Sequence, residues 1–304
     1  MDLAVQTEYL FLKINLVLTF LHWRRATRLS CFFRIFVKTR KKMKRFILLQ
    51  SLCLLSTFVF AQTKKTIFSP NNPNGIAVIC CPGGGYETIC NEHEGNGWAK
   101  EFNEMGITWI VVDYQLPNGN PELPFSSILE TMKDIKAHAK DYKIDTTKIG
   151  IAGFSAGGHL AATYSRYAPA NEKPAFQILF YPVISMNEKL THKGSLTHLL
   201  GESYSSKAVK HYSLEEQAEK SIPPTIIFAS KDDSVVPIDN SINYYNSLQK
   251  KGVPVNLQIF PFGNHGWGND KNFIYHQAII EELSKFFAEG ISSNVIYEYL
   301  PIKE

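Results

Sequence analysis

Six short stretches of the chain are apolar at nearly every position, and they recur between residues 77 and 260. Many of their residues are β-branched, and near-continuous apolar runs of this length are typical of strands buried on both faces of a parallel sheet. We therefore predict strands over residues 77–81, 108–114, 149–153, 176–181, 225–230 and 255–260.

Segments with apolar residues at helical spacing lie between or after several of these strands. The clearest cover residues 126–142, 237–251 and 272–288, where apolar residues recur three and four positions apart. Strands that alternate with helices favour right-handed crossovers. The pattern thus predicts an α/β fold, a doubly wound and mostly parallel sheet with helices on both faces.

One stretch, at about residues 186–221, departs from this alternation because it is polar and irregular, with only short helical pieces. It falls between two predicted strands, where a small lid or substrate wall can form. The length of residues 62–304 suits one domain with a single large core. We predict a single domain over 62–304 that carries this small insertion.

Residues 43–61 have the features of a secretory signal peptide. Lys44 and Arg45 precede an apolar run that ends in small residues, and the run is short for a membrane-spanning helix. Six of the seven arginines lie at or before Arg45. We predict that Met43 is the true start, that residues 1–42 are a spurious extension, and that the protein is exported to the periplasm or outside the cell. A membrane anchor is the alternative.

The charge balance depends on this division. The whole chain has a formal net charge of +4, but residues 1–61 hold 11 of its 32 basic side chains and two of its 28 acidic ones. That leaves residues 62–304 with a net charge of −5. Nothing in this balance favours nucleic acid as a partner, and we expect no stable membrane span after signal cleavage.

Three cysteines remain after the predicted cleavage site, Cys80, Cys81 and Cys90. Two are adjacent and the third lacks partners, a spacing that matches no zinc site. We expect no metal and no cofactor. Cys80 and Cys81 are predicted as strand residues without a redox role, and a disulfide from Cys90 to one of them is the alternative in an exported protein.

Candidate chemistry follows the predicted strands. In an open α/β sheet, ligands bind beyond the carboxyl ends of the strands. Four strand ends there deliver a glycine-rich loop, a serine, an acidic pair and a histidine, in the segments "PGGGY" (82–86), "FSAGG" (154–158), "KDDSVVP" (231–237) and "PFGNHGWG" (261–268).

These residue types supply what a serine nucleophile needs. The Ser155 hydroxyl requires a base to accept its proton, and His265 can serve. The imidazole requires an anion to fix its tautomer, which Asp232 or Asp233 can provide. The order Ser, Asp, His is that of the α/β-hydrolases.

Glycines complete the pattern on both sides of the serine. Gly153 and Gly157 frame Ser155 because a sharp turn brings neighbouring atoms too close for side chains. The tetrahedral intermediate carries an oxyanion that needs N–H donors, and the amide of Ala156 and those of residues 83–85 can supply them. The tri-glycine lacks the ending of a phosphate-binding loop.

As a set, these motifs resemble the α/β-hydrolase fold enzymes over residues 67 to about 290. The resemblance is greatest to the acetyl-esterase-like branch related to hormone-sensitive lipase and to bacterial acetyl-xylan and feruloyl esterases. It rests on "PGGGY", "HEGNGWAKEFNEMGITWIVVDYQLP", "IDTTKIGIAGFSAGGHLAA", "PPTIIFASKDDSVVP" and "GNHGWG".

This resemblance assigns roles to individual residues. It implies a triad of Ser155, Asp232 and His265, because enzymes of the family place the acid three residues before the valine of a D-x-x-V turn. Asp233 is then expected to cap that turn. The implied oxyanion donors are Gly84, Gly85 and Ala156.

Two departures from the family pattern are visible. Pro82 stands where the branch often has a histidine before the glycines, so the glycine loop must be anchored differently. Gln115 stands where arginine is frequent, so an ion pair there is absent. We further interpret His159 as a packing residue beneath the turn at Ser155. Tyr86 and Trp267 are predicted to contact substrate, with a core role as the alternative for Trp267.

The sequence therefore predicts an exported serine esterase that acts through an acyl-enzyme. With about twenty residues between the predicted cleavage site and Pro82, we expect an open site for a bulky alcohol with a small acyl group, such as acetylated xylan. A lipase or general carboxylesterase, an exopeptidase that uses Glu92 and Glu94, and a non-catalytic carbohydrate-binding module are the alternatives.

Overall fold

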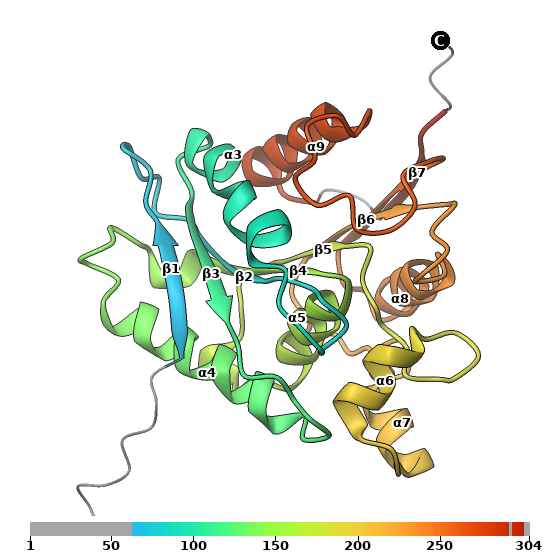
Figure 1. Cartoon of the computed structure of the whole chain (residues 1–304). Helices are drawn as coiled ribbons and strands as arrows, with labels where there is room; N and C mark the ends of the chain where they lie inside the picture. Colours follow the sequence, from blue (N-terminus) through green and yellow to red (C-terminus); the bar gives the residue numbers. More distant parts are fainter. Residues whose placement is uncertain (1–62, 292–293, 301–304) are drawn as a thin grey trace, which may run out of the picture. The chain divides into compact units, whose positions relative to one another are not determined.

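An eight-stranded sheet runs through the part of the chain that this computed structural model describes, residues 63–291 and 294–300 (Figure 1). These residues fall within one compact unit, Gln62–Glu304. The predicted extension at 1–42 and the predicted signal peptide at 43–61 lie outside the described residues.

The strands of this sheet are β1 (Lys64–Phe68), β2 (Ala77–Cys81), β3 (Thr108–Asp113), β4 (Ile149–Phe154), β5 (Gln177–Phe180), β6 (Thr225–Ser230), β7 (Val255–Phe260) and β8 (Val295–Glu298). Their order in space is β1-β3-β2-β4-β5-β6-β7-β8. All neighbours are parallel except β1, which pairs antiparallel with β3. The predicted α/β class with a mostly parallel sheet is confirmed.

All six predicted strands are present, with ends that differ by one residue at most. The two strands that the pattern missed, β1 and β8, are the edges of the sheet. Every residue of β8 is exposed, and β1 is exposed or half-buried throughout. Edge strands are held by backbone hydrogen bonds on one side, so they carry no apolar run that a sequence pattern could reveal.

The helices of the described residues are α3 (Ala99–Glu104), α4 (Glu122–Ala137), α5 (Ser155–Tyr167), α6 (Lys193–Leu200), α7 (Ser206–Tyr212), α8 (Asp239–Lys250) and α9 (His276–Glu289). A short π-helical turn, Asn91–Gly95, and a 3-10 turn, Asn96–Trp98, precede α3. Further 3-10 turns cover Thr146–Lys148 and Ala170–Glu172.

These helices form a layer on each side of the sheet, with α3 and α9 on one face and α4, α5 and α8 on the other (Figure 1). Alternate residues of a strand enter the two cores. In β2, Ile79 packs toward the side of α4, α5 and α8, whereas Val78 packs toward α3 and α9. Each face of the sheet is thereby removed from water, which explains the near-continuous apolar runs.

The three predicted helices exist with shifted ends. α4 begins at Glu122, before the first apolar residue of the expected pattern, because Pro121 sets a helical backbone angle just ahead of it. α9 begins at His276, since Asp270 accepts the backbone N–H of Asn272 and forms a turn in the preceding residues. The insertion at 186–221 contains α6 and α7.

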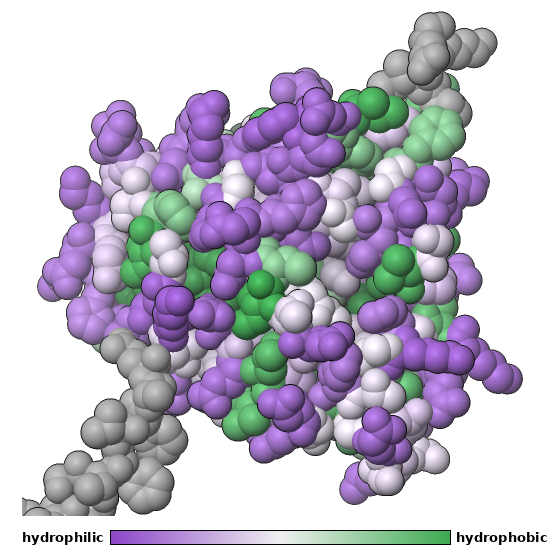
Figure 2. Space-filling model, in the orientation of Figure 1, coloured by the Kyte–Doolittle hydropathy of each residue, from purple (hydrophilic) through white to green (hydrophobic). Residues whose placement is uncertain are grey.

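Hydrophilic residues cover most of the face shown in Figure 2, where hydrophobic residues appear in small separate groups. Among the helices of the described residues, none combines the length and the apolar character needed to cross a membrane.

Candidate active site

The four loops singled out by the sequence follow β2, β4, β6 and β7. In the sheet, β2 lies beside β4 and β6 lies beside β7, with β5 between the two pairs. Because these strands are parallel, their carboxyl ends meet at one edge of the sheet. We call residues 82–86 the glycine loop and residues 261–268 the histidine loop.

Ser155 occupies the sharp turn between β4 and α5. Its φ of +50° lies in the left-handed region, which residues other than glycine seldom adopt. A Cβ atom on Gly153 would lie 2.2 Å from the carbonyl oxygen of Gly157, and one on Gly157 would lie 2.1 Å from that of Cys81. The steric reason predicted for these two glycines is confirmed.

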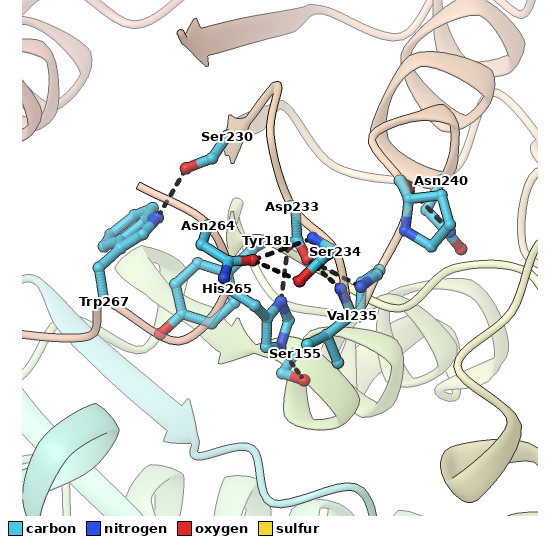
Figure 3. A network of polar contacts seen from close by, with 12 residues as sticks. Ser155, Tyr181, Ser230, Asp233, Ser234, Val235, Asn240, Asn264, His265 and Trp267 are labelled. Atoms are coloured by element: carbon cyan, nitrogen blue, oxygen red, sulfur yellow. Dashed lines mark hydrogen bonds and ion pairs between the residues drawn. The ribbon is translucent and has the colours of Figure 1, made fainter. Parts of the chain in front are cut away.

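The structure brings Ser155 and His265 together and adds Asp233 (Figure 3). The Ser155 Oγ lies 2.8 Å from His265 Nε2, and His265 Nδ1 lies 2.7 Å from Asp233 Oδ2. The Asp233 side chain is only 2% exposed, and its Oδ1 accepts the backbone N–H groups of Val235 and Val236 at 2.9 and 2.8 Å. This geometry fixes the imidazole with one nitrogen toward the acid and the other toward the serine.

The sequence-based choice of Asp232 as the acid of the triad is wrong. Asp232 Oδ1 accepts the backbone N–H of Asn264 at 2.8 Å, and its Oδ2 accepts that of Gly263 at 3.3 Å. Its carboxylate therefore binds the backbone of the histidine loop and does not contact the imidazole. Counting back three residues from Val235 identified the correct turn, but the direction of each side chain depends on how the loop folds.

The peptide groups of the glycine loop are arranged around Ser155. The N–H of Gly83 donates to Glu94 Oε2 at 2.7 Å, so it is already occupied. The carbonyl oxygen of Gly83 accepts the N–H of Cys90, and that of Gly84 accepts the N–H of Thr88. In a trans peptide the next N–H points the opposite way. The N–H groups of Gly84 and Gly85 thus point away from Cys90 and Thr88. This orientation agrees with their predicted role as donors to the oxyanion.

Gly83 itself lies against the nucleophile. A Cβ atom on Gly83 would be 2.9 Å from Ser155 Cβ, so only a residue without a side chain fits beside the serine here. Ala156, the third predicted donor, is buried in the first turn of α5. The N–H groups of a first helical turn have no partner within the helix and remain able to bind an anion.

Neither residue predicted to contact substrate is placed to do so. Tyr86 is 1% exposed, and its hydroxyl donates to His159 Nδ1 at 2.9 Å. Trp267 is 6% exposed; its indole N–H donates to Ser230 Oγ and its ring stacks on Phe273, turned away from Ser155 (Figure 3). Both predictions are corrected. Burying these large aromatic rings stabilises the fold more than an exposed position would.

His159 lies beneath the turn, as its interpretation as a packing residue requires. It is fully buried, and its Nε2 donates to the carbonyl oxygen of Tyr212 at 2.8 Å. Its Nδ1 must then accept the hydroxyl of Tyr86, which joins α5 to the glycine loop and to the insertion. Burial lowers the pKa of His159 to about 4, so it is neutral at pH 7.

Glu94 is a residue of this site that the sequence reasoning did not place there. It is 5% exposed, and besides Gly83 it accepts the hydroxyl of Tyr181 at 2.8 Å. Burial raises its pKa, which its hydrogen bonds with Tyr181 and Gly83 partly offset. Glu92 is exposed and accepts from Asn96, so the two glutamates do not form the acidic pair considered for an exopeptidase. Pro82 in place of histidine was the available signal that another anchor is needed.

The insertion contributes two histidines beside the glycine loop. His198 in α6 donates from Nδ1 to the carbonyl oxygen of Gly85 at 2.9 Å. His192 precedes α6, accepts the N–H of Ser195, and has its Cε1 3.6 Å from where a Cβ on Gly85 would be. Partial burial and the charges of His265 and His198 lower the pKa of His192, which Asp233 opposes. The insertion therefore contacts the glycine loop beside the site.

The three cysteines of the described residues are free thiols. Cys80 and Cys81 are buried in β2, where burial raises the pKa of both, and Cys90 is exposed. The alternative of a disulfide to Cys90 is not observed. The described residues also contain no group of three or more His, Cys, Asp or Glu side chains placed to hold a metal ion.

A family model of the α/β-hydrolase fold matches residues 79–269. The chain therefore belongs to the α/β-hydrolase fold family, and the predicted resemblance is confirmed.

Known proteins similar to this chain include two bacterial enzymes whose names refer to xylan. An acetylxylan esterase of Xylanibacter ruminicola is 36% identical over 262 residues, which are 80% of this chain and 55% of that protein. An endo-1,4-beta-xylanase B of Butyrivibrio fibrisolvens is 34% identical over 213 residues, 64% of this chain and 33% of that protein. The chain thus spans about half, or less, of these relatives.

Among solved structures, an acetyl ester-xyloside bifunctional hydrolase from Caldicellulosiruptor lactoaceticus is similar over most of its length. The TM-score is 0.68 and the identity 31%, with 74% of this chain and 86% of that chain covered. A sugar hydrolase from Lactococcus lactis has a TM-score of 0.65 at 26% identity, covering 75% of this chain and 94% of that chain.

Proposed function

We propose that this protein is a serine esterase that removes short acyl groups, acetyl above all, through an acyl-enzyme intermediate. The observation that carries the proposal is the continuous hydrogen-bonded chain from Ser155 Oγ through His265 to Asp233, at 2.8 and 2.7 Å. Its place at the carboxyl edge of an α/β-hydrolase sheet and the esterases among the relatives support it.

The reaction follows from this geometry. Ser155 Oγ attacks the ester carbonyl carbon while His265 Nε2 takes the hydroxyl proton, and Asp233 stabilises the imidazolium that forms. The amides of Gly84, Gly85 and Ala156 stabilise the negative oxygen of the tetrahedral intermediate. His265 then gives its proton to the departing alcohol, which leaves the acyl group on Ser155.

A second half-reaction releases the acid. Water attacks the acyl carbonyl carbon while His265 takes one of its protons, and the same amides stabilise the second tetrahedral intermediate. When that intermediate collapses, His265 returns the proton to Ser155 Oγ. The carboxylic acid departs and the enzyme is restored.

Acetylated polysaccharide, xylan in particular, is the substrate class we assign to this site. One relative is an acetylxylan esterase and a similar solved structure is an acetyl ester-xyloside hydrolase, both by their names. A polysaccharide is too large to enter the cytoplasm intact and is degraded outside it. This agrees with the proposed export through a signal peptide at residues 43–61.

The test of the reaction compares the wild type with Ser155→Ala on p-nitrophenyl esters from acetyl to octanoyl and on acetylated xylo-oligosaccharide. We expect fast acetyl cleavage that declines with acyl length, and a loss of kcat of about 10⁴-fold or more in the variant. Acetate release from the oligosaccharide identifies the alcohol.

Ser165→Ala is a matched control for this variant. Ser165 lies in the same helix, is fully buried, and its hydroxyl has no hydrogen-bond partner among the described residues. It should retain wild-type kcat. Equal inactivity of the wild type and Ser155→Ala on every ester would reject the esterase proposal.

Export has its own test. The full chain is expressed in a Gram-negative host, and the N-terminus of the protein recovered from the periplasm or medium is determined by mass spectrometry. The proposal expects a mature protein that begins at Gln62. Retention of the uncleaved chain in the cytoplasm or the membrane fraction would contradict it.

A further inference from the structure

We propose that Glu94 is a positioning residue whose carboxylate holds the glycine loop and the histidine loop in one fixed arrangement around Ser155. The proposal rests on the proposed esterase function, and it assigns a role to a group outside the triad. It also answers how the glycine loop is anchored when Pro82 stands where related enzymes often have a histidine.

The carboxylate of Glu94 forms a bridge between two elements. Its Oε2 accepts the N–H of Gly83, the residue of the glycine loop next to Pro82, at 2.7 Å. Its Oε1 accepts the hydroxyl of Tyr181, which directly follows β5, at 2.8 Å. The side chain lies almost wholly out of water. Charge-assisted hydrogen bonds of this kind are stronger than those between neutral groups.

Tyr181 extends the bridge to the base. Its hydroxyl oxygen accepts the N–H of Gly268, the last residue of the histidine loop, at 3.0 Å. Its ring lies 4.8 Å from the ring of His265, centroid to centroid, in an edge-to-face arrangement. One carboxylate and one phenol thereby connect the loop that supplies the proposed oxyanion donors with the loop that supplies the base.

The hydrogens of this network fit an ionised carboxylate. A backbone N–H can only donate, so Glu94 Oε2 must accept from Gly83 and the Tyr181 oxygen must accept from Gly268. The single hydroxyl hydrogen of Tyr181 is then directed to Glu94 Oε1. Both carboxylate oxygens act as acceptors, which glutamine cannot reproduce because one of its two terminal atoms is an N–H₂ donor.

Gly83 lies between the Glu94 carboxylate and the nucleophile Ser155. A Cβ atom on Gly83 would lie 2.6 Å from Glu94 Oε2 and 2.9 Å from Ser155 Cβ. Gly83 is therefore in close contact with the carboxylate and the serine at once. We therefore expect a displaced Glu94 carboxylate to shift the glycine loop relative to Ser155 Oγ, and errors of about 1 Å in such positions cost about 100-fold in rate.

Keeping this carboxylate buried costs stability. Burial raises the pKa of Glu94, so the folded protein favours the neutral acid more than the unfolded chain does. The ionised group therefore destabilises the fold once the pH exceeds the range in which free glutamate titrates. The titratable groups that face it are Tyr181, His265, His93, Cys80, Cys90 and Tyr114.

The test uses the full chain and the variant Glu94→Gln, with a fluorophosphonate probe as well as p-nitrophenyl acetate. In the labelling reaction Ser155 Oγ forms a bond to phosphorus, the phosphorus–fluorine bond breaks, fluoride leaves and His265 takes the serine proton. We expect Glu94→Gln to slow both labelling and kcat by about 10- to 100-fold, with KM little changed. Its thermal midpoint at pH 8 should equal or exceed that of the wild type.

Two further variants make the result specific. Glu92→Gln changes an exposed glutamate two residues away on the same short turn, and it should label at the wild-type rate. Tyr181→Phe removes the other half of the bridge and should also slow labelling. Because both changes break one network, the double variant should lose much less than the product of the two single losses.

The outcomes separate this proposal from the esterase proposal. A wild type that labels but cleaves no ester would reject the esterase function, while the labelling rates of the variants still test Glu94. Wild-type labelling by Glu94→Gln would overturn the positioning role. So would a loss of labelling that parallels a fall in thermal midpoint, since that pattern indicates a merely structural residue.

Discussion

Two adjacent aspartates after β6 have different tasks at the scale of single residues. The Asp233 side chain is nearly inaccessible to water; one oxygen contacts His265, and the other accepts two backbone N–H groups. Asp232 is exposed and accepts two backbone N–H groups of the histidine loop. The first arrangement orients an imidazole, and the second shapes the loop that carries it.

This division predicts unequal effects of the same substitution. Asp233→Asn should lower kcat/KM by about 10³- to 10⁴-fold, because an amide favours the wrong tautomer of the imidazole. Asp232→Asn should lower it less than about tenfold and reduce the free energy of unfolding by about 1 kcal/mol through weaker loop hydrogen bonds. Steady-state kinetics and guanidinium unfolding of both variants check this.

If Asp232→Asn lowered kcat/KM more than Asp233→Asn does, Asp232 would be the acid of the triad. Equal losses would mean that the histidine loop moves as a unit and that neither carboxylate acts alone.

At the scale of elements, the insertion at 186–221 is part of the site. Its helix α6 reaches the glycine loop through His198, which donates to the carbonyl oxygen of Gly85. This carbonyl belongs to the Gly85–Tyr86 peptide, which directly follows the peptide that carries the Gly85 N–H. The contact therefore helps to set the orientation of the glycine loop. The segment that the sequence set apart as polar and irregular therefore contacts the glycine loop.

We accordingly predict that His198→Ala lowers kcat by about tenfold. Without this donor the Gly85 carbonyl is no longer held, so the glycine loop can rotate and one hydrogen bond to the oxyanion weakens. His211→Ala, an exposed histidine of α7 in the same insertion, is the control and should leave kcat unchanged. Kinetics on p-nitrophenyl acetate would distinguish them. Identical kcat values for the two variants would show that the insertion does not hold the glycine loop.

Across the whole molecule, buried titratable groups make stability depend on pH in opposite senses. Burial lowers the pKa of His159, and partial burial lowers the pKa values of His192 and His276, so the folded protein resists taking up protons that the unfolded chain binds. These groups destabilise the fold as the pH falls. Glu94 acts the other way, because its raised pKa makes the fold more stable as it takes up a proton.

The large pKa shift of the fully buried His159 gives a prediction. The pKa of His159 falls from 6.5 to about 4, so acidification through that window should cost up to roughly 3 kcal/mol of unfolding free energy. His159→Gln cannot titrate and should show a flatter pH dependence. Guanidinium unfolding of both proteins at pH 7.5, 6 and 5 measures it, and a difference that stays constant with pH would contradict the prediction.

The fold could be read from the sequence wherever burial on both faces left an apolar run, as it did for the six inner strands. The edge strands β1 and β8 escaped because backbone pairing at an edge requires no particular side chains. Helix ends shifted by a few residues, since capping depends on local turns such as the one at Asp270.

Within the site, the sequence by itself determined the order of the loops and placed Ser155 and His265 at the carboxyl ends of β4 and β7. The alternation of apolar runs with helical segments predicts parallel strands, and residues that follow parallel strands meet at the carboxyl edge of the sheet. This pattern says nothing of the direction in which a loop side chain points.

Only the tertiary structure decided which aspartate contacts His265, that Tyr86 and Trp267 are buried, and that Glu94 joins the glycine loop to Tyr181. Each of these depends on hydrogen bonds or packing between residues far apart in the chain, 87 positions in the case of Glu94 and Tyr181. A sequence pattern records spacing along one dimension, whereas such contacts depend on the positions of atoms in three.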